Sequence, residues 1–289
     1  MRQWHPVFAE LLRPVVEAYY DVQTTVPVGD RPREADFVLL RRTAAGTPPF
    51  EGLWRHLTTW NILEFKGPTV SPRSEDIDLL IELGLGIDRR LREEHARQTR
   101  GAVPIGEVSF WYVANHLGRR FVRGAAQRLG SLDSLGPGLW RCRLLGRLLF
   151  WVSSIDLPVE QDSLPLHIVG QEPRATERQV ARLLLERPEL EARYGGWLAS
   201  LHPAAWREVE AMARTAGKKF EIDLRPAIEY LGLKQVVEQV GLARVIEEFG
   251  AKQVVEQLGG REVVKQLGLD GILASLSPAE RRELKRRLQ

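Results

Sequence analysis

The pattern of apolar and polar positions divides the first 170 residues into helices and strands that alternate along the chain. Apolar residues recur at helical spacing from Phe8 to Tyr20, and Pro14 should kink or split that helix. Short segments rich in β-branched and aromatic residues are typical of strands. We therefore expect helices at residues 8–20, 71–98 and 117–130, strands at residues 21–28, 35–42, 56–66 and 107–115, and a hairpin at residues 139–154 that turns at Gly146-Arg147.

Two further segments extend this pattern. Residues 164–170 are mostly apolar and predict one more strand. Residues 174–217 have helical spacing, with breaks expected near Gly195-Gly196 and His202-Pro203. Ser71 or Ser74 is expected to cap the long helix that begins near them, since acids follow in its first turns, where they suit the helix dipole. Helices alternating with strands predict an α/β fold.

The sequence changes character after residue 222, where five nine-residue units follow one another with glycines at positions 232, 241, 250, 259 and 268. Each unit has apolar residues at its fifth, sixth and ninth positions, and each glycine is expected to end a short helix. Helices of six or seven residues are unstable alone, so the units should stack on each other or on a partner. Ser277, Pro278 and Glu280 predict a terminal capping helix. We divide the chain into a first domain (1–172), a helical connector (173–222) and a repeat region with its cap (223–289).

Composition excludes several classes of protein. The hydrophobic fraction of 44% and the charged fraction of 27% are ordinary for a soluble globular chain. The N-terminus does not resemble a signal peptide, and no apolar segment is long enough to span a membrane. A lone cysteine, Cys142, cannot form an internal disulfide and fits a reducing compartment. We therefore expect a cytoplasmic protein that does not enter a membrane.

One apolar strand contains an unexpected pair of charges. The segment "WNILEFKGPT" begins at Trp60 and reads as a buried strand, yet it places Glu64 and Lys66 two residues apart, on one face. The chain has 34 arginines and 7 lysines, and Lys66 is the only lysine before Lys218. A lysine in this position suggests that a compact amine is needed where a guanidinium would not serve.

The order of the strands brings a second carboxylate towards this pair. If the strand at residues 35–42 pairs with the strand at residues 56–66, Asp36 can approach Glu64 within about 5 Å and share one divalent ion with it. Two carboxylates make an oxygen site suited to Mg²⁺ or Mn²⁺, and the backbone carbonyl of Phe65 is a further possible ligand. Lys66 would then hold or deprotonate a water beside the metal and stabilise charge on a phosphate.

This arrangement resembles the PD-(D/E)XK nuclease superfamily. The matching residues are Asp36 and the Glu64-Phe65-Lys66 segment, preceded and followed by a helix, over roughly residues 5–130. The resemblance implies a restriction-endonuclease-like core, a mixed sheet flanked by helices, with Asp36 and Glu64 as metal ligands and Lys66 as the catalytic lysine. It also implies a further acid from the first helix, here Glu10 or Glu17, with Glu10 preferred. Ala35 replaces the proline of the motif. The short repeats are similar to the tails of bacterial transposase-associated, recombination-promoting nucleases.

The resemblance implies a Mg²⁺-dependent deoxyribonuclease, an endonuclease that hydrolyses DNA phosphodiester bonds. Arg119, Arg120 and Arg123 are candidates to bind phosphates, with a solvated helix face as the equal alternative. Residues 230–289 are expected to mediate assembly, most simply as a homodimer. Two rival readings stay open: a nuclease fold with weak or lost activity that serves as a scaffold through its repeats, and a regulator that only binds nucleic acid.

Overall fold

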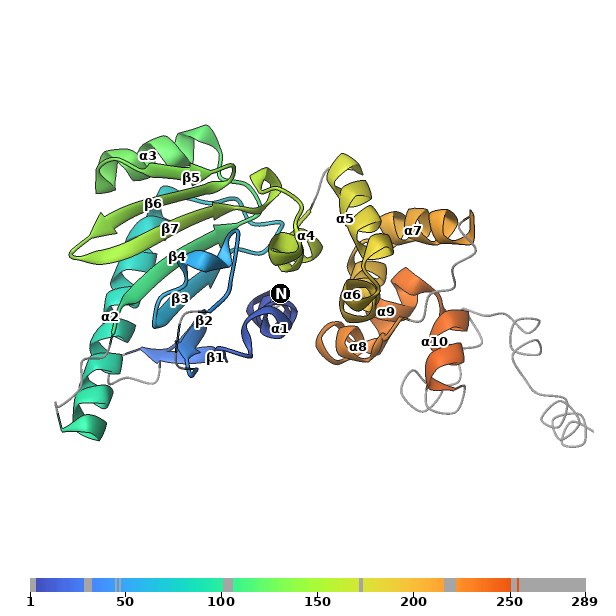
Figure 1. Ribbon diagram of the computed structural model, residues 1–289, viewed down its shortest axis with the longest axis horizontal. Coiled ribbons are helices and arrows are strands. Elements are labelled where there is room, and N and C mark those ends of the chain that lie inside the picture. The colour runs from blue at the N-terminus through green and yellow to red at the C-terminus, as the bar shows by residue number, and fades with distance from the viewer. Residues whose placement is uncertain are drawn as a thin grey trace, which may run out of the picture. The chain divides into compact units, whose positions relative to one another are not determined.

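The computed structural model describes residues 4–28, 33–44, 46, 48–100, 106–171, 174–215, 222–250 and 254, except the side chains at 25–28, 33–36, 243, 247 and 248. The chain forms two compact units, Met1–Leu183 and Leu184–Gln289, which are described separately. Figure 1 labels the helices and strands of both. Within the described residues, no helix has both the length and the apolar character needed to span a membrane.

The first unit is an α/β fold built on one sheet of seven strands (Figure 1). The element order of its first part, one helix, three strands, one helix and one strand, is the order that the sequence predicts. The elements are α1 (Trp4–Val16), β1 (Tyr20–Val28), β2 (Arg33–Arg42), β3 (Trp60–Phe65), α2 (Ser74–Thr99), β4 (Val108–Ala114), α3 (Arg119–Leu129), β5 (Asp133–Gly136), β6 (Leu139–Leu144), β7 (Arg147–Ser153) and α4 (Leu164–Val169).

The sheet is mixed, with the strand order β1-β2-β3-β4-β7-β6-β5. The pairs β1–β2 and β2–β3 are antiparallel, and β3–β4 and β4–β7 are parallel. The pairs at the far edge, β7–β6 and β6–β5, are antiparallel again. Because a parallel pair needs a long crossover, α2 connects β3 to β4. The three central parallel strands therefore end at the same edge of the sheet.

Helices cover both faces of the sheet. On one face, Ile77 and Leu80 of α2 and Phe121 of α3 pack with buried strand residues such as Ile62 and Tyr112. On the other face, Phe8 of α1 stacks on Phe65 with ring centroids 4.6 Å apart, and α4 lies beside α1. Strand residues alternate between these two hydrophobic layers. Glu64 therefore belongs to the face that α2 covers, since it lies two positions after Ile62.

The second unit contains only helices within its described residues. Its elements continue from α5 (Arg174–Glu186), which crosses the boundary between the units, and include α6 (Pro188–Leu201), α7 (Pro203–Thr215), α8 (Arg225–Leu231), α9 (Leu233–Val240) and α10 (Leu242–Phe249). The first two nine-residue units are α9 and α10, and Gly232, Gly241 and Gly250 beside them have φ of 84°, 97° and 79°. The three later units and the capping helix expected from Ser277 lie outside the described residues, apart from parts of the third, so a five-unit repeat stays a prediction.

Four local predictions are wrong. Tyr20 opens β1, because α1 ends two residues after Pro14. Residues 164–170 form the buried helix α4, in which Pro165 occupies the first turn, where proline is tolerated. Gly195-Gly196 lies inside α6, where a side chain on Gly196 would collide with the carbonyl of Asp223. The N-cap of α2 is Arg73, and neither predicted serine fills that position. Strand β5 is an element that the sequence pattern did not predict.

Candidate active site

Glu64 and Lys66 meet at the carboxyl end of β3. The Lys66 ammonium nitrogen lies 2.8 Å from Oε1 of Glu64, and the two side chains are 15% and 12% exposed. The Lys66 backbone N–H donates to the carbonyl of Val113 at 2.8 Å, so the pairing with β4 continues past the end of β3. Extended backbone through this segment places side chains 64 and 66 on one face, as strand geometry requires.

The residue after Lys66 is a glycine for a steric reason. A Cβ on Gly67 would overlap the indole of Trp4, which lies in the first turn of α1. Glycine thus allows α1 to pack against the end of β3. The following loop leads directly into α2.

Asp76, the third residue of α2, completes the cluster. Its Oδ1 lies 3.2 Å from Nζ of Lys66. Its Oδ2 accepts one hydrogen bond from the backbone N–H of Arg73 and another from the hydroxyl of Tyr112, each at 2.8 Å. The same carboxylate thus caps α2 and contacts Lys66, just after β3, and Tyr112 of β4. We call Glu64, Lys66, Asp76 and Tyr112 the Lys66 cluster.

The protonation states in this cluster follow from its contacts. Burial acts to lower the pKa of Lys66, but the carboxylates of Glu64 and Asp76 outweigh burial and raise that pKa above its ordinary value. Burial acts to raise the pKa of Asp76, but the Arg73 N–H, the Tyr112 hydroxyl and Lys66 together lower it. Burial, followed by the nearby Asp76 and Glu64, strongly raises the pKa of Tyr112. At neutral pH the cluster therefore holds an ammonium, a neutral phenol and an ionised Asp76.

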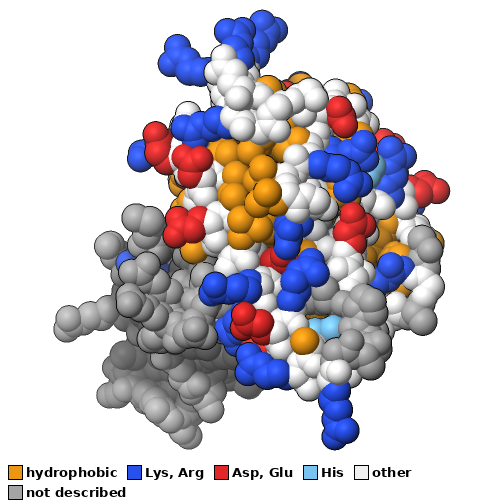
Figure 2. All heavy atoms as spheres, turned by 90° about the vertical axis from the view of Figure 1, so that its left-hand side faces the viewer, with side chains coloured by type: hydrophobic (Ala, Val, Ile, Leu, Met, Phe, Trp, Pro, Cys, Tyr) orange, Lys and Arg blue, Asp and Glu red, His pale blue; other side chains and the backbone are white. Residues whose placement is uncertain are grey.

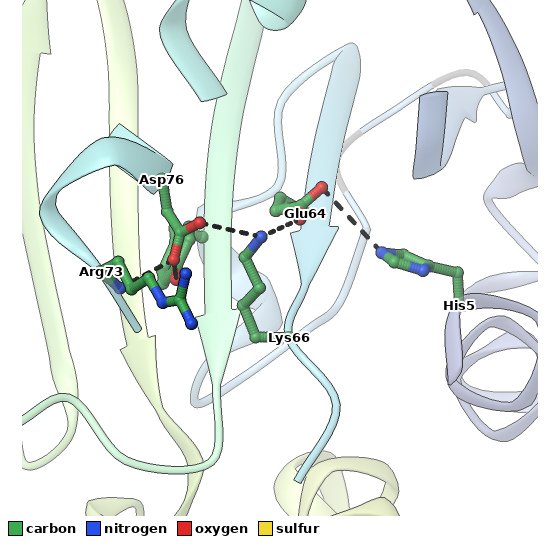
Figure 3. A network of polar contacts seen from close by, with 6 residues as sticks. His5, Glu64, Lys66, Arg73 and Asp76 are labelled. Atoms are coloured by element: carbon green, nitrogen blue, oxygen red, sulfur yellow. Dashed lines mark hydrogen bonds and ion pairs between the residues drawn. The ribbon is translucent and has the colours of Figure 1, made fainter. Parts of the chain in front are cut away.

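A histidine from α1 approaches the other side of Glu64. Nε2 of His5 lies 4.0 Å from Oε2 of Glu64, and the His5 ring meets Phe65 edge-on. Figure 3 shows Glu64 between Lys66 and His5, with Asp76 on the far side of Lys66. Elements from both faces of the sheet thus meet at this end of β3.

The predicted metal ligand Asp36 lies in β2, one residue before Phe37, which pairs with Glu64. Val26 pairs with Ala35 and Thr24 with Val38, so β2 has one extra residue opposite β1 at this point. Such a β-bulge bends a strand and is common beside active sites, where it redirects a side chain. The side chain of Asp36 lies outside the described part of the structure, so the expected approach of about 5 Å to Glu64 stays a prediction.

The other predicted metal ligands remain predictions too. Glu10 forms an ion pair with Arg13 one turn later in α1, with 3.2 Å between Oε2 and Nε, and Glu17 is exposed just past the end of that helix. Among the residues that the structure describes, no three His, Cys, Asp or Glu side chains gather as a metal-binding group. The donor chemistry at the end of β3 nevertheless fits a hard cation, because Glu64 and Asp76 bring two carboxylates to one ammonium.

The three predicted phosphate-binding arginines lie on α3, and all are exposed. Arg120 lines a cavity of about 600 Å³ between the loop that follows Lys66 and the start of α3. Arg119 and Arg123 are not part of its lining.

The sequence analysis missed three members of this site: Asp76, Tyr112 and His5. Asp76 had a local signal, since an acid at the third position of a helix commonly caps it. Tyr112 could not be assigned to the site from the sequence, because its position depends on the register that pairs it with Glu64 in the parallel strands β3 and β4. His5 had no signal, because its place depends on how α1 packs.

No protein-family model matches this chain, and no curated protein or solved structure matches it either.

Proposed function

We propose that this protein is a metal-dependent endonuclease that hydrolyses phosphodiester bonds in DNA. The observation that carries the proposal is the contact of Glu64 with Lys66 at the carboxyl end of β3. In open α/β sheets, ligands bind outside the carboxyl ends of the parallel strands, and β3, β4 and β7 all end at this edge. The mixed sheet and the order of its first elements support the resemblance to the PD-(D/E)XK nucleases.

Glu64 has the metal-binding role in this proposal, together with Asp36 from the bulge in β2 and the backbone carbonyl of Phe65. A bound Mg²⁺ or Mn²⁺ supplies Lewis-acid chemistry, which lowers the pKa of water and polarises a phosphoryl oxygen. Glu64 also pairs with Lys66, so it couples the metal-binding position to the cation beside it.

Lys66 acts as a fixed cation in this proposal. Its raised pKa keeps the amine protonated at neutral pH, which favours charge stabilisation over the alternative role of proton acceptor. The ammonium donates to an oxygen of the phosphate as negative charge develops there. Asp76 holds the ammonium from the opposite side, and the Tyr112 hydroxyl fixes Asp76 in turn. Orienting contacts of this kind reduce the reorganisation needed during reaction.

Plasmid cleavage tests the proposal. The purified chain is incubated with supercoiled plasmid and Mg²⁺ or Mn²⁺, beside a sample with EDTA. Wild type should produce nicked and linear DNA, and Glu64→Ala and Lys66→Ala should not. Lys234→Ala, which removes an exposed lysine of α9, is the matched control and should retain activity. Equal cleavage by wild type and Lys66→Ala would assign the activity to a contaminant or to another site.

Self-association through residues 230–289 is a second, separate part of the proposal. In the described units, Val236, Val237 and Val245 are buried within this chain, since α9 packs on α6 and α8 and α10 packs on α9. Assembly would therefore depend on residues beyond α10. A chain that ends at Gly250 should be a monomer in light scattering, whereas the wild-type chain should be a dimer. An unchanged number of chains per particle, together with an inactive Lys66 site, would favour the scaffold reading with another partner.

A further inference from the structure

A solvent-open cavity begins two residues after Lys66. Its volume is about 600 Å³, within the range of ligand-binding clefts, about 300–1,000 Å³. One wall is the loop from Pro68 to Ser74, and another is formed by residues 115–121 around the start of α3. Its lining includes Arg73, His116 and Arg120 and no aspartate or glutamate. This composition favours an anionic ligand over a cationic one.

The arginines of this cavity have no counterion in the part of the chain that the structure describes. Within the described residues, the side chains of Arg73 and Arg120 form no hydrogen bond or ion pair. Arg128, on the same helix as Arg120, instead binds Asp78 at 2.7 Å and the carbonyl of Ser74 at 2.9 Å. The surface shown in Figure 2 differs from the lining of this cavity, because there basic and acidic side chains are interspersed around a hydrophobic patch. Unpaired guanidinium groups beside an acid-free cavity are available to a ligand.

Helix stability does not account for the positions of these arginines. Arg73 is the N-cap of α2, a position that favours Ser, Thr, Asp or Asn. Arg120 is the second residue of α3, whose first turn has no acid. A cation near the positive end of a helix dipole is unfavourable, so both arginines oppose the local preference. They are better explained by what they face, which is the cavity.

One wall of the cavity is held rigidly. The side-chain amide of Asn115 donates to the carbonyl of Gln171 at 3.1 Å and accepts from the Gln171 N–H at 2.7 Å. On the same wall, Nδ1 of His116 lies 3.6 Å from Oδ2 of Asp156. A pre-formed wall binds a ligand with little loss of conformational freedom.

We infer that this cavity binds the phosphodiester backbone of DNA through Arg73 and Arg120, next to the Lys66 cluster. The inference deepens the proposed function, and it rests on that function for the choice of DNA among phosphate-bearing ligands. Planar guanidinium groups bind phosphate oxygens in pairs, and such contacts position a nucleic acid without reading its sequence. Arg73 also connects the two sites directly, because its backbone N–H donates to Asp76 and the same residue lines the cavity.

Binding without cleavage tests the inference. The full chain is titrated against a short fluorescein-labelled duplex DNA in EDTA, with fluorescence anisotropy as the readout, over a series of salt concentrations. The double variant Arg73→Ala/Arg120→Ala should bind about tenfold more weakly at low salt, and its salt dependence should fall by about two units of slope. The matched control Arg143→Ala/Arg182→Ala removes two exposed arginines that likewise have no partner in the described residues, and it should bind within about twofold of wild type.

The possible outcomes separate the proposed DNA-binding cavity from the proposed nuclease activity. An equal loss in both double variants would overturn the cavity site, because it would reflect net charge alone. Tighter binding of an RNA duplex, or full competition by inorganic phosphate at equal phosphate concentration, would overturn the assignment to DNA. Circular dichroism and thermal melting check that the variants are folded. The binding titration contains no metal and therefore does not depend on cleavage. If wild type binds DNA through this cavity but does not cleave plasmid when Mg²⁺ or Mn²⁺ is present, the nuclease is rejected and the binding site is retained.

Discussion

Two clusters of charged side chains are anchored on the same helix, α2, and they differ in how completely the protein encloses them. In the middle of the helix, Asp88 is 1% exposed, and its two oxygens accept from Arg92 at 2.8 Å and Arg147 at 2.7 Å. At the start of the helix, Asp76 and Glu64 share the single ammonium of Lys66.

The balance of charge separates a structural cluster from a reactive one. Around Asp88, one buried carboxylate has two cations, and each of its oxygens accepts a hydrogen bond from an arginine. In the Lys66 cluster, two carboxylates flank one ammonium, and their side chains are 12% and 16% exposed. Two carboxylates at a partly open position suit an incoming cation. Burial of a carboxylate is therefore not itself a sign of a site, whereas two carboxylates around one ammonium at a partly open position are.

The largest expected effect comes from exchanging the type of cation in each cluster. Lys66→Arg should lower the rate of plasmid cleavage about 100-fold or more, because a wide guanidinium cannot take the place of the compact amine between Glu64 and Asp76. Arg92→Lys, the reciprocal change beside Asp88, should leave the rate unchanged. Initial rates of nicking measure both, and full activity in Lys66→Arg would show that the lysine is incidental.

Removing the enclosed carboxylate should affect stability instead of activity. Asp88→Ala leaves Arg147 and Arg92 without their acceptor and should lower the free energy of unfolding by about 2 kcal/mol. Urea denaturation measures this loss. The cleavage rate per folded molecule should not change, and a specific loss of activity would place Asp88 in the site.

The Asp76 carboxylate should make a pH-dependent contribution to the free energy of unfolding. Its pKa is lowered from the ordinary value of 3.8 in the folded protein, so its stabilising effect is present above that value and is lost as pH falls through the folded pKa. Asp76→Asn should therefore cost about 1 kcal/mol of unfolding free energy at neutral pH and almost nothing near the acid limit of folding. Denaturation curves at the two pH values test the sign. A constant difference would mean that packing, and not charge, explains the effect.

The smallest expected effect is the loss of one hydroxyl. Tyr112→Phe removes the donor to Oδ2 of Asp76 but leaves the Arg73 N–H in place, so it should cost about 1 kcal/mol or less. Cleavage should fall only a few-fold, because Asp76 still contacts Lys66. A loss as large as that of Lys66→Arg would give Tyr112 a direct role at the phosphate.

The local pattern of apolar residues and turn residues was enough to predict most of the secondary structure of the first unit. Alternation and turn residues located six of its seven strands, because each strand must bury one face or both. They also placed Glu64 and Lys66 on the same face, since the period of a strand is fixed by its backbone. Residues 164–170 show the limit: a short apolar segment is compatible with a buried strand or a buried helix, and only its packing beside α1 decided for the helix α4.

The sequence by itself determined the Glu64–Lys66 pair, the α/β class and the order of the first elements, because these depend on neighbours within a few positions. The tertiary structure alone decided the rest of the site. Asp76 is ten positions after Lys66 and His5 is far before Glu64, and each reaches the cluster only because a helix packs against the end of β3. Packing and register determine which side chains of different elements come into contact, and neither can be predicted from the spacing of residues in the sequence.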